Sequence, residues 1–146
     1  MTSTKPIYVL NGPNLNRLGK REPEIYGITT LAEIEVMCRE AAGDWPIAFH
    51  QTNSEEKLIG LVHEAIDEGA AILINPAAFT FTSLALLDAL KMFPGPIVEL
   101  HISNIHRREP IYHRSYVSMT ATSVMAGFGA AGYPMAIRAI IERLQG

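Results

Sequence analysis

The sequence contains a single cysteine, Cys38, no long apolar run and no strong excess of either charge. One cysteine excludes an intramolecular disulfide framework and is typical of a reducing compartment. No apolar run reaches the roughly 18 residues of a membrane-spanning helix, and the N-terminal residues lack a signal-peptide pattern. The 12 basic and 15 acidic residues leave a net charge of −3, which argues against a chain-wide nucleic-acid-binding surface. We therefore expect a cytoplasmic protein that binds neither membranes nor nucleic acid.

Internal repeats, low-complexity tracts and linker-like segments are also absent from the sequence. The 146 residues suffice for one domain, 1–146, which can bury roughly 70% of the surface of the unfolded chain. The five histidines lack the spacing of known metal motifs, so we expect no metal site. No lysine follows a predicted buried strand, which argues against a Schiff-base mechanism.

Short apolar segments alternate with helical patterns along the chain. Strands are predicted at residues 7–10, 46–51, 71–74, 97–101 and 123–126, and helical spacing of apolar residues occurs at 31–38, 58–66, 83–92 and 137–144. This alternation predicts an α/β protein with helices on both faces of a parallel sheet. We expect a flavodoxin-like three-layer sandwich with strand order 2-1-3-4-5, in which ligands bind at the carboxyl ends of the strands.

Polar side chains gather at those expected strand ends. Asn11 and Asn14 follow the first strand, Asn75 ends the third, and the fourth carries Glu99 and His101. Ordinary turn chemistry would explain any single asparagine. Side chains two apart on a strand share a face, so Glu99 and His101 are neighbours. A carboxylate beside an imidazole favours its protonated form, as a general acid requires. A structural ion pair is the alternative, but the cost of burying charge favours a functional role.

The polar segment from Asn14 to Thr29 is long for a compact domain and indicates a functional loop. Within it, Arg17–Gly27 is densely charged, and Gly19 and Gly27 could serve as the hinges of a lid. Tyr26 can act as a base only as a phenolate, which a neighbouring guanidinium favours. Arg21 is the candidate for that guanidinium. A solvated loop with a surface tyrosine is the alternative interpretation.

Two further motifs receive a structural interpretation. Residues 127–132 match the pattern G-x-G-x-x-G, but no strand and no suitably spaced acidic residue follow them. We therefore expect a tight turn packed closely against a helix. Cys38 falls on the apolar face of its helix and is expected to be a core residue, not a nucleophile.

Taken together, the motifs resemble type II 3-dehydroquinate dehydratase over nearly the whole chain. They are Val9–Asn16, Arg21–Gly27, Asn75-Pro76, Glu99–His106 and Arg108-Glu109. The resemblance implies a hydro-lyase of the shikimate or quinate pathway that converts 3-dehydroquinate to 3-dehydroshikimate without metal or other cofactor. It also implies a homo-oligomer in which trimers assemble into a dodecamer.

The resemblance assigns roles to individual residues. Tyr26 would be the base and Arg21 the cation that keeps it deprotonated. Asn14 would hold a water near the developing enolate oxygen. His101 would protonate the departing hydroxyl, with Glu99 orienting and tuning the imidazole.

Other positions are implied to bind substrate. Asn75 and the backbone N–H groups of Ile102 and Ser103 would hold the substrate carboxylate, and Arg108 would also contact the substrate. Asp88 matches a position that approaches the site of a neighbouring subunit.

Three residues depart from the family pattern: Ala77 replaces a glycine, Phe81 a histidine and Tyr112 an arginine. The histidine and arginine normally hold ring hydroxyls of the substrate, and each lost hydrogen bond should weaken binding by about 1–3 kcal/mol. One hypothesis is therefore a dehydroquinase with altered hydroxyl recognition. The other is a paralogue that dehydrates a related cyclic β-hydroxy ketone lacking those hydroxyls.

A non-catalytic flavodoxin-like module is a further alternative. A receiver domain requires acidic residues where this chain has Asn11 and Asn75. A flavin carrier requires a phosphate-binding loop rich in serine, threonine and glycine, where Pro13 and Leu15 stand here. Both features argue against a module of this class.

Overall fold

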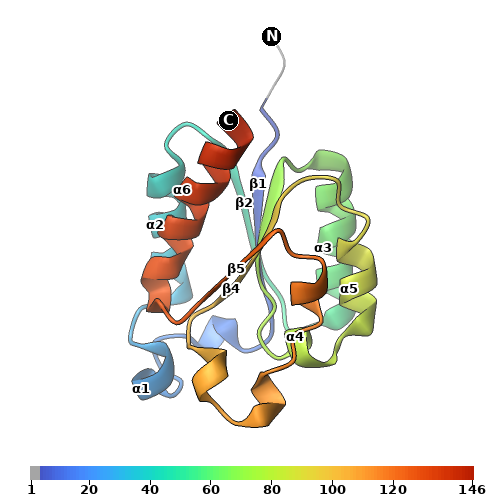
Figure 1. Cartoon of the computed structure of the whole chain (residues 1–146). Coiled ribbons are helices and arrows are strands. Elements are labelled where there is room, and N and C mark those ends of the chain that lie inside the picture. The colour runs from blue at the N-terminus through green and yellow to red at the C-terminus, as the bar shows by residue number, and fades with distance from the viewer. Residues whose placement is uncertain (1–3) are drawn as a thin grey trace.

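The computed structural model describes residues 4–146, and its centre is one sheet of five parallel strands (Figure 1). The strands are β1 (Ile7–Asn11), β2 (Ile47–Gln51), β3 (Ala71–Asn75), β4 (Ile97–His101) and β5 (Ser123–Ala126). Their order is β2-β1-β3-β4-β5, and every neighbouring pair is parallel. The predicted order 2-1-3-4-5 is therefore confirmed.

Helices cover both faces of the sheet (Figure 1). One face is covered by α2 (Leu31–Ala42) and α6 (Gly132–Gln145), and the other by α3 (Glu55–Glu68) and α5 (Leu84–Leu90). Alternate side chains of a strand point to opposite faces. Ile7 and Val9 accordingly enter the core beneath α2 and α6, whereas Tyr8 and Leu10 enter the core beneath α3 and α5. Both cores fix the central strands, and thereby the positions of the strand ends.

The two structural interpretations of the sequence are confirmed. Gly127 and Gly129 have φ values of 93° and 64°, as expected for a tight turn. A Cβ on Gly132 would lie 3.0 Å from Leu100 Cδ1, so the helix packs closely there. Cys38 has no exposed surface, and burial raises the pKa of its thiol to about 12. Within residues 4–146, no helix combines the length and apolar character needed to cross a membrane.

The carboxyl ends of the strands are surrounded by short segments that periodicity did not predict. These are α1 (Pro23–Tyr26), α4 (Phe79–Thr82) and 3-10 turns at 15–17, 105–107, 110–112, 117–119 and 129–131. Figure 1 shows α1, α4 and the chain that follows β4 gathered at one end of the molecule. Such segments are too short to show an amphipathic repeat.

The first strand end requires a glycine. A Cβ on Gly12 would lie 2.4 Å from the carbonyl oxygen of Pro76, whereas a Cβ on Gly60, on an exposed turn of α3, would meet no atom within 4 Å. We expect Gly12→Ala to lower the free energy of unfolding by about 1–3 kcal/mol because the backbone must shift. Gly60→Ala should raise it by about 0.5–1 kcal/mol. Urea unfolding measures both, and equal effects of the two changes would contradict this packing.

Candidate active site

One cleft lies at the carboxyl ends of the strands and collects most of the predicted residues. Its lining consists of Pro13, Asn14, Leu15, Arg21, Tyr26, Asn75, Ala77, Ala78, Phe81, His101, Ile102, Ser103, Ile105, Arg108 and Tyr112. Tyr26 and His101 therefore face the same space, although α1 carries one and β4 the other. Of the residues to which the resemblance assigns a role, Glu99 and Asp88 are outside this lining, as is Asn11 at the end of the first strand.

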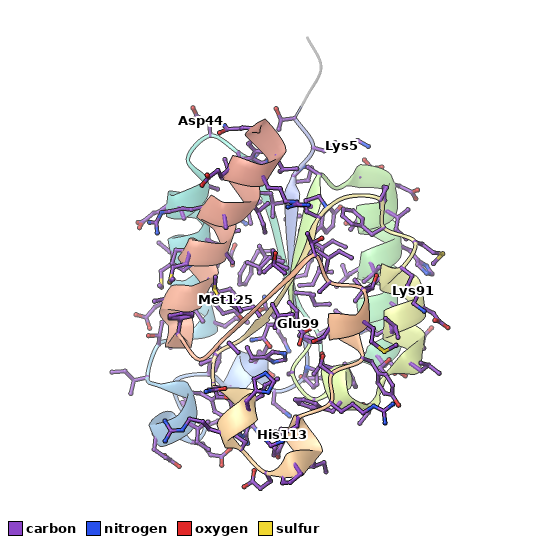
Figure 2. The ribbon with its side chains drawn as sticks, in the orientation of Figure 1. Lys5, Asp44, Lys91, Glu99, His113 and Met125 are labelled. Atoms are coloured by element: carbon purple, nitrogen blue, oxygen red, sulfur yellow. The ribbon has the colours of Figure 1, made fainter. Side chains whose placement is uncertain are left out.

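Glu99 lies inside the molecule (Figure 2), and its carboxylate contacts the imidazole of His101. The Glu99 side chain has no exposed surface, and only 5% of His101 is exposed. His101 Nε2 lies 2.5 Å from Glu99 Oε2. Because this pair occupies Nε2, Nδ1 is the ring nitrogen left for a ligand in the cleft. The carboxylate thus orients the imidazole, as their spacing on the strand predicted.

Two serines complete the surroundings of the Glu99 carboxylate. Ser115 Oγ donates to Oε2 at 2.9 Å, and Ser118 Oγ donates to Oε1 at 2.5 Å. Burial by itself would raise the pKa of Glu99, but hydrogen bonds from His101, Ser118 and Ser115, with the charge of His101, hold the pKa below its ordinary value. Sequence reasoning missed both serines. The one available signal was that a buried carboxylate needs several donors.

The tyrosine at the other side of the cleft is flanked by two guanidinium groups. Arg108 Nη1 donates to the Tyr26 hydroxyl oxygen at 3.1 Å. Arg21 instead lies over the ring, with Cζ 4.8 Å from the ring centre. The sequence predicted Arg21 as the guanidinium beside Tyr26, and the family resemblance implied that Arg108 contacts the substrate. Arg21 does lie beside Tyr26, with its Nε 3.5 Å from Glu22 Oε2, but the hydrogen bond to the phenol oxygen comes from Arg108.

Asn75 is held by a buried network. Its Nδ2 donates to the Tyr133 hydroxyl at 2.9 Å, and its Oδ1 accepts from the Ala77 N–H at 3.2 Å. The Tyr133 hydroxyl donates in turn to Asn11 Oδ1 at 2.7 Å, and burial raises the pKa of Tyr133, which keeps this donor protonated. Asn11 Nδ2 donates to the carbonyl of His50 at 3.0 Å. Asn11 therefore acts within the fold, and Asn75 presents its amide to the cleft.

Asn14 and the end of β4 contribute further polar groups. Asn14 adopts a left-handed conformation with φ of 72°, and its N–H donates to Asn53 Oδ1 at 2.8 Å. Asn14 is also one of the residues that line the cleft. Ile102 and Ser103 follow β4 directly and line the same cleft. Small-molecule sites commonly combine such converging polar groups with an apolar wall.

The wall of the cleft at positions 81 and 112 is aromatic. The rings of Phe81 and His101 are stacked, with centroids 6.1 Å apart and planes at 24°. Tyr112 meets Phe81 edge to face, with centroids 5.4 Å apart and planes at 77°. Ala77, the third departure, has φ of 51°, a conformation that costs an L-residue roughly 1–2 kcal/mol and suits glycine better.

Asp88 lies on α5, outside the cleft of its own chain. Its side chain is 71% exposed, and Lys91 Nζ lies 4.0 Å from its carboxylate. A role at a neighbouring subunit stays a prediction. In the part of the chain from residue 4 onwards, no group of three histidine, cysteine or acidic side chains could hold a metal ion.

Comparison with known proteins connects this arrangement to one family. Residues 5–141 match the family model described as dehydroquinase class II. A 3-dehydroquinate dehydratase of Cereibacter sphaeroides is 51% identical over 148 aligned positions, which cover 100% of this chain and 99% of that protein. One of Methylobacterium radiotolerans is 56% identical over 134 positions, 90% of either chain. The crystal structure of type II dehydroquinase from Propionibacterium acnes superposes with a TM-score of 0.90 at 40% identity, covering 100% of both chains.

The buried carboxylate predicts a pH-dependent contribution to stability. Since the pKa of Glu99 is lower in the folded protein than its ordinary value of 4.5, its contribution is complete above pH 4.5 and is lost as pH falls through the folded pKa. We expect Glu99→Gln to lower the unfolding free energy by about 1–3 kcal/mol near pH 7 and the deficit to shrink in acid. Denaturant unfolding across pH measures this, with the exposed Glu142→Gln as control. A deficit that does not change with pH would contradict an ionised Glu99.

Proposed function

The chain belongs to the class II dehydroquinase family, and on that premise we propose that it dehydrates 3-dehydroquinate to 3-dehydroshikimate, with Tyr26 as base and His101 as acid. The observation that carries this proposal is that both side chains line one cleft, Tyr26 beside a guanidinium and His101 beside a carboxylate. A phenol oxygen next to a guanidinium and an imidazole next to a carboxylate form a matched base and acid.

The base removes the proton at C2 of the substrate, which the adjacent ketone acidifies. The Tyr26 oxygen accepts a hydrogen bond from Arg108, and the Arg21 guanidinium lies over the same ring. Two positive charges stabilise a phenolate, the form of tyrosine that can accept this proton. In this proposal Arg108 shares the role that the family resemblance gave to Arg21 alone.

The acid completes the elimination. As the C1–O bond breaks, His101 donates a proton to the leaving hydroxyl, which departs as water. The electrons of the C2–H bond, held in the enolate, form the new double bond. Glu99 accepts from His101 Nε2, so the donating atom is Nδ1. The negative carboxylate favours the imidazolium that the step requires.

Polar groups of the cleft stabilise charge in the substrate. Asn75, together with the N–H groups of Ile102 and Ser103, is proposed to bind the substrate carboxylate. Support comes from the location of all three in the cleft and from the network that fixes the Asn75 amide. Asn14 is proposed to hold a water at the enolate oxygen, which stabilises charge that develops in the transition state.

The biological setting is proposed by the same reasoning. A place in the shikimate or quinate pathway follows from the substrate, and a cytoplasmic location agrees with a lone cysteine that is buried. A trimer-based dodecamer is proposed from the family resemblance. Asp88 is exposed and lies outside the cleft of its own chain, so its side chain is available to approach the cleft of a neighbouring subunit.

A second candidate reaction is favoured by the aromatic wall. Phe81 and Tyr112 present rings where the family holds substrate hydroxyls. A paralogue acting on a cyclic β-hydroxy ketone without those hydroxyls would gain from this wall. The elimination chemistry would be unchanged.

The acid and base are separable by experiment. We expect Tyr26→Phe to lower kcat by about 10²–10⁴, measured by the ultraviolet absorbance of the conjugated enone product. His101→Gln should lower the rate of product formation by a similar factor. This variant should still exchange the C2 hydrogen of the substrate for deuterium in D₂O, because the base remains. Tyr8→Phe, which removes a hydroxyl bonded to Glu64 outside the cleft, is the matched control and should retain activity. Retained activity in Tyr26→Phe would eliminate Tyr26 as the base.

Substrate analogues distinguish the two candidate reactions. We expect kcat/KM on 3-dehydroquinate to equal or exceed that on analogues lacking the ring hydroxyls. Parallel assays with the wild-type protein measure this ratio. An analogue preferred by about tenfold or more, equivalent to about 1.4 kcal/mol in the transition state, would contradict the first candidate and support the paralogue.

A further inference from the structure

We propose that Phe81 and Tyr112 are positioning residues that, together with Arg108, link the acid to the base across the cleft. The inference rests on the proposed function, since it assigns His101 and Tyr26 their roles. It differs from the role of substrate binding implied for positions 81 and 112. Its basis is a continuous series of contacts from His101 through Phe81, Tyr112 and Arg108 to Tyr26.

The first contact holds the acid. Phe81 lies on the short helix α4 and stacks on the His101 ring, with 6.1 Å between centroids. Glu99 already fixes the ring through Nε2. A hydrogen bond at one nitrogen leaves the ring free to rotate about that bond, and a flat neighbour restricts this rotation. Phe81 thereby fixes the direction in which Nδ1 points.

The last contact holds the base. Arg108 Cζ lies 4.0 Å from the centre of the Tyr112 ring, within the range of a close guanidinium–aromatic stack. From that position Arg108 Nη1 reaches the Tyr26 oxygen at 3.1 Å. His113 Nε2 donates to the Arg108 carbonyl at 2.6 Å and fixes the backbone of the same arginine. With backbone and guanidinium both held, the donor is preorganised at the phenol oxygen.

The base needs this support more than the acid does. The helix α1 that carries Tyr26 has four residues, none of them fully buried, whereas His101 ends a strand that is buried throughout. Packing in the core therefore fixes the position of His101, whereas the position of Tyr26 depends on contacts outside the core. The edge-to-face contact of Phe81 with Tyr112 connects the two sides, and a pair of this kind has a preferred angle as well as a preferred distance.

A fixed distance between the acid and the base should affect the rate of the chemical step more than the binding of substrate. Reacting groups held in attack geometry lower the barrier, whereas uniform binding lowers KM alone. Loss of the Tyr112 ring should consequently lower kcat more than it raises KM. It should also free Arg108 from the phenol oxygen, so that a higher pH is needed to form the phenolate.

The decisive comparison is Tyr112→Leu with Tyr112→Phe. We expect Tyr112→Leu to lower kcat about tenfold or more, to change KM less, and to move the acid-side limb of the kcat/KM profile to higher pH. Tyr112→Phe keeps the ring and should recover most of the lost activity. Ile111→Ala, at a neighbouring side chain that is 73% exposed, is the control and should behave as the wild type. Far-UV circular dichroism checks that each variant is folded.

Coupling between the two aromatic residues provides a second arm. Phe81→Leu should lower kcat without moving the acid-side limb, because its direct contact is with His101. Since the two rings belong to one series of contacts, Phe81→Leu should cost less in the Tyr112→Leu background than in the wild type. Strictly additive effects would contradict the linked arrangement.

A readout without substrate separates this inference from the proposed reaction. Tyrosinate absorbance, taken as the difference between each protein and its Tyr26→Phe counterpart, reports ionisation of Tyr26 directly. In Tyr112→Leu this absorbance should rise at higher pH than in the wild type. An unchanged titration, or a loss of affinity in KM alone, overturns the positioning role even if the wild type dehydrates 3-dehydroquinate. Absence of wild-type dehydration with a shifted titration overturns the proposed reaction and leaves the Tyr112–Arg108–Tyr26 linkage supported.

Discussion

The buried carboxylate of Glu99 determines how the end of the sheet is built. An ionised group removed from water requires donors to offset its lost hydration, and none of its surface is exposed. One donor, His101, comes from the same strand, but Ser115 and Ser118 come from the segment between β4 and β5. That segment must therefore fold back over the strand end. Its earlier residues, among them Arg108, are brought to the cleft by the same requirement.

The two sides of the cleft are held with unequal firmness. On one side, His101 and Asn75 end buried strands, and each is fixed through hydrogen bonds to buried partners. On the other side, Tyr26 lies on a four-residue helix between Gly19 and Gly27, both of which have positive φ. In the proposed mechanism, the acid and the groups that bind the substrate carboxylate lie on the firmly held side, and the base lies on the less firmly held side. This division follows from which residues the buried core contacts.

Much of the sheet could be predicted from the sequence because its central strands contain continuous apolar runs, at residues 7–10 of β1 and 71–74 of β3. The predicted strands at 97–101 and 123–126 also coincide with β4 and β5. The pairing of Glu99 with His101 was equally accessible, since spacing by two on a strand is a local rule. The contact of Arg108 with Tyr26 joins residues 82 positions apart through two irregular segments. Neither periodicity nor motif spacing carries that information, so the sequence pointed only to Arg21, which lies in the same loop as Tyr26.

The departures at positions 81 and 112 are best understood as a pair. Each is an aromatic residue where the family resemblance implied a polar one, and in the structure the two rings touch each other. Under the proposed function, a single aromatic residue facing a histidine or an arginine would forfeit one contact with substrate and gain little packing. Two aromatic residues together form a wall that stacks on His101 at one end and on Arg108 at the other. Arg108 also reaches the phenol oxygen of Tyr26. Under the proposed function, the aromatic wall would therefore link recognition of the substrate ring to the geometry of proton transfer.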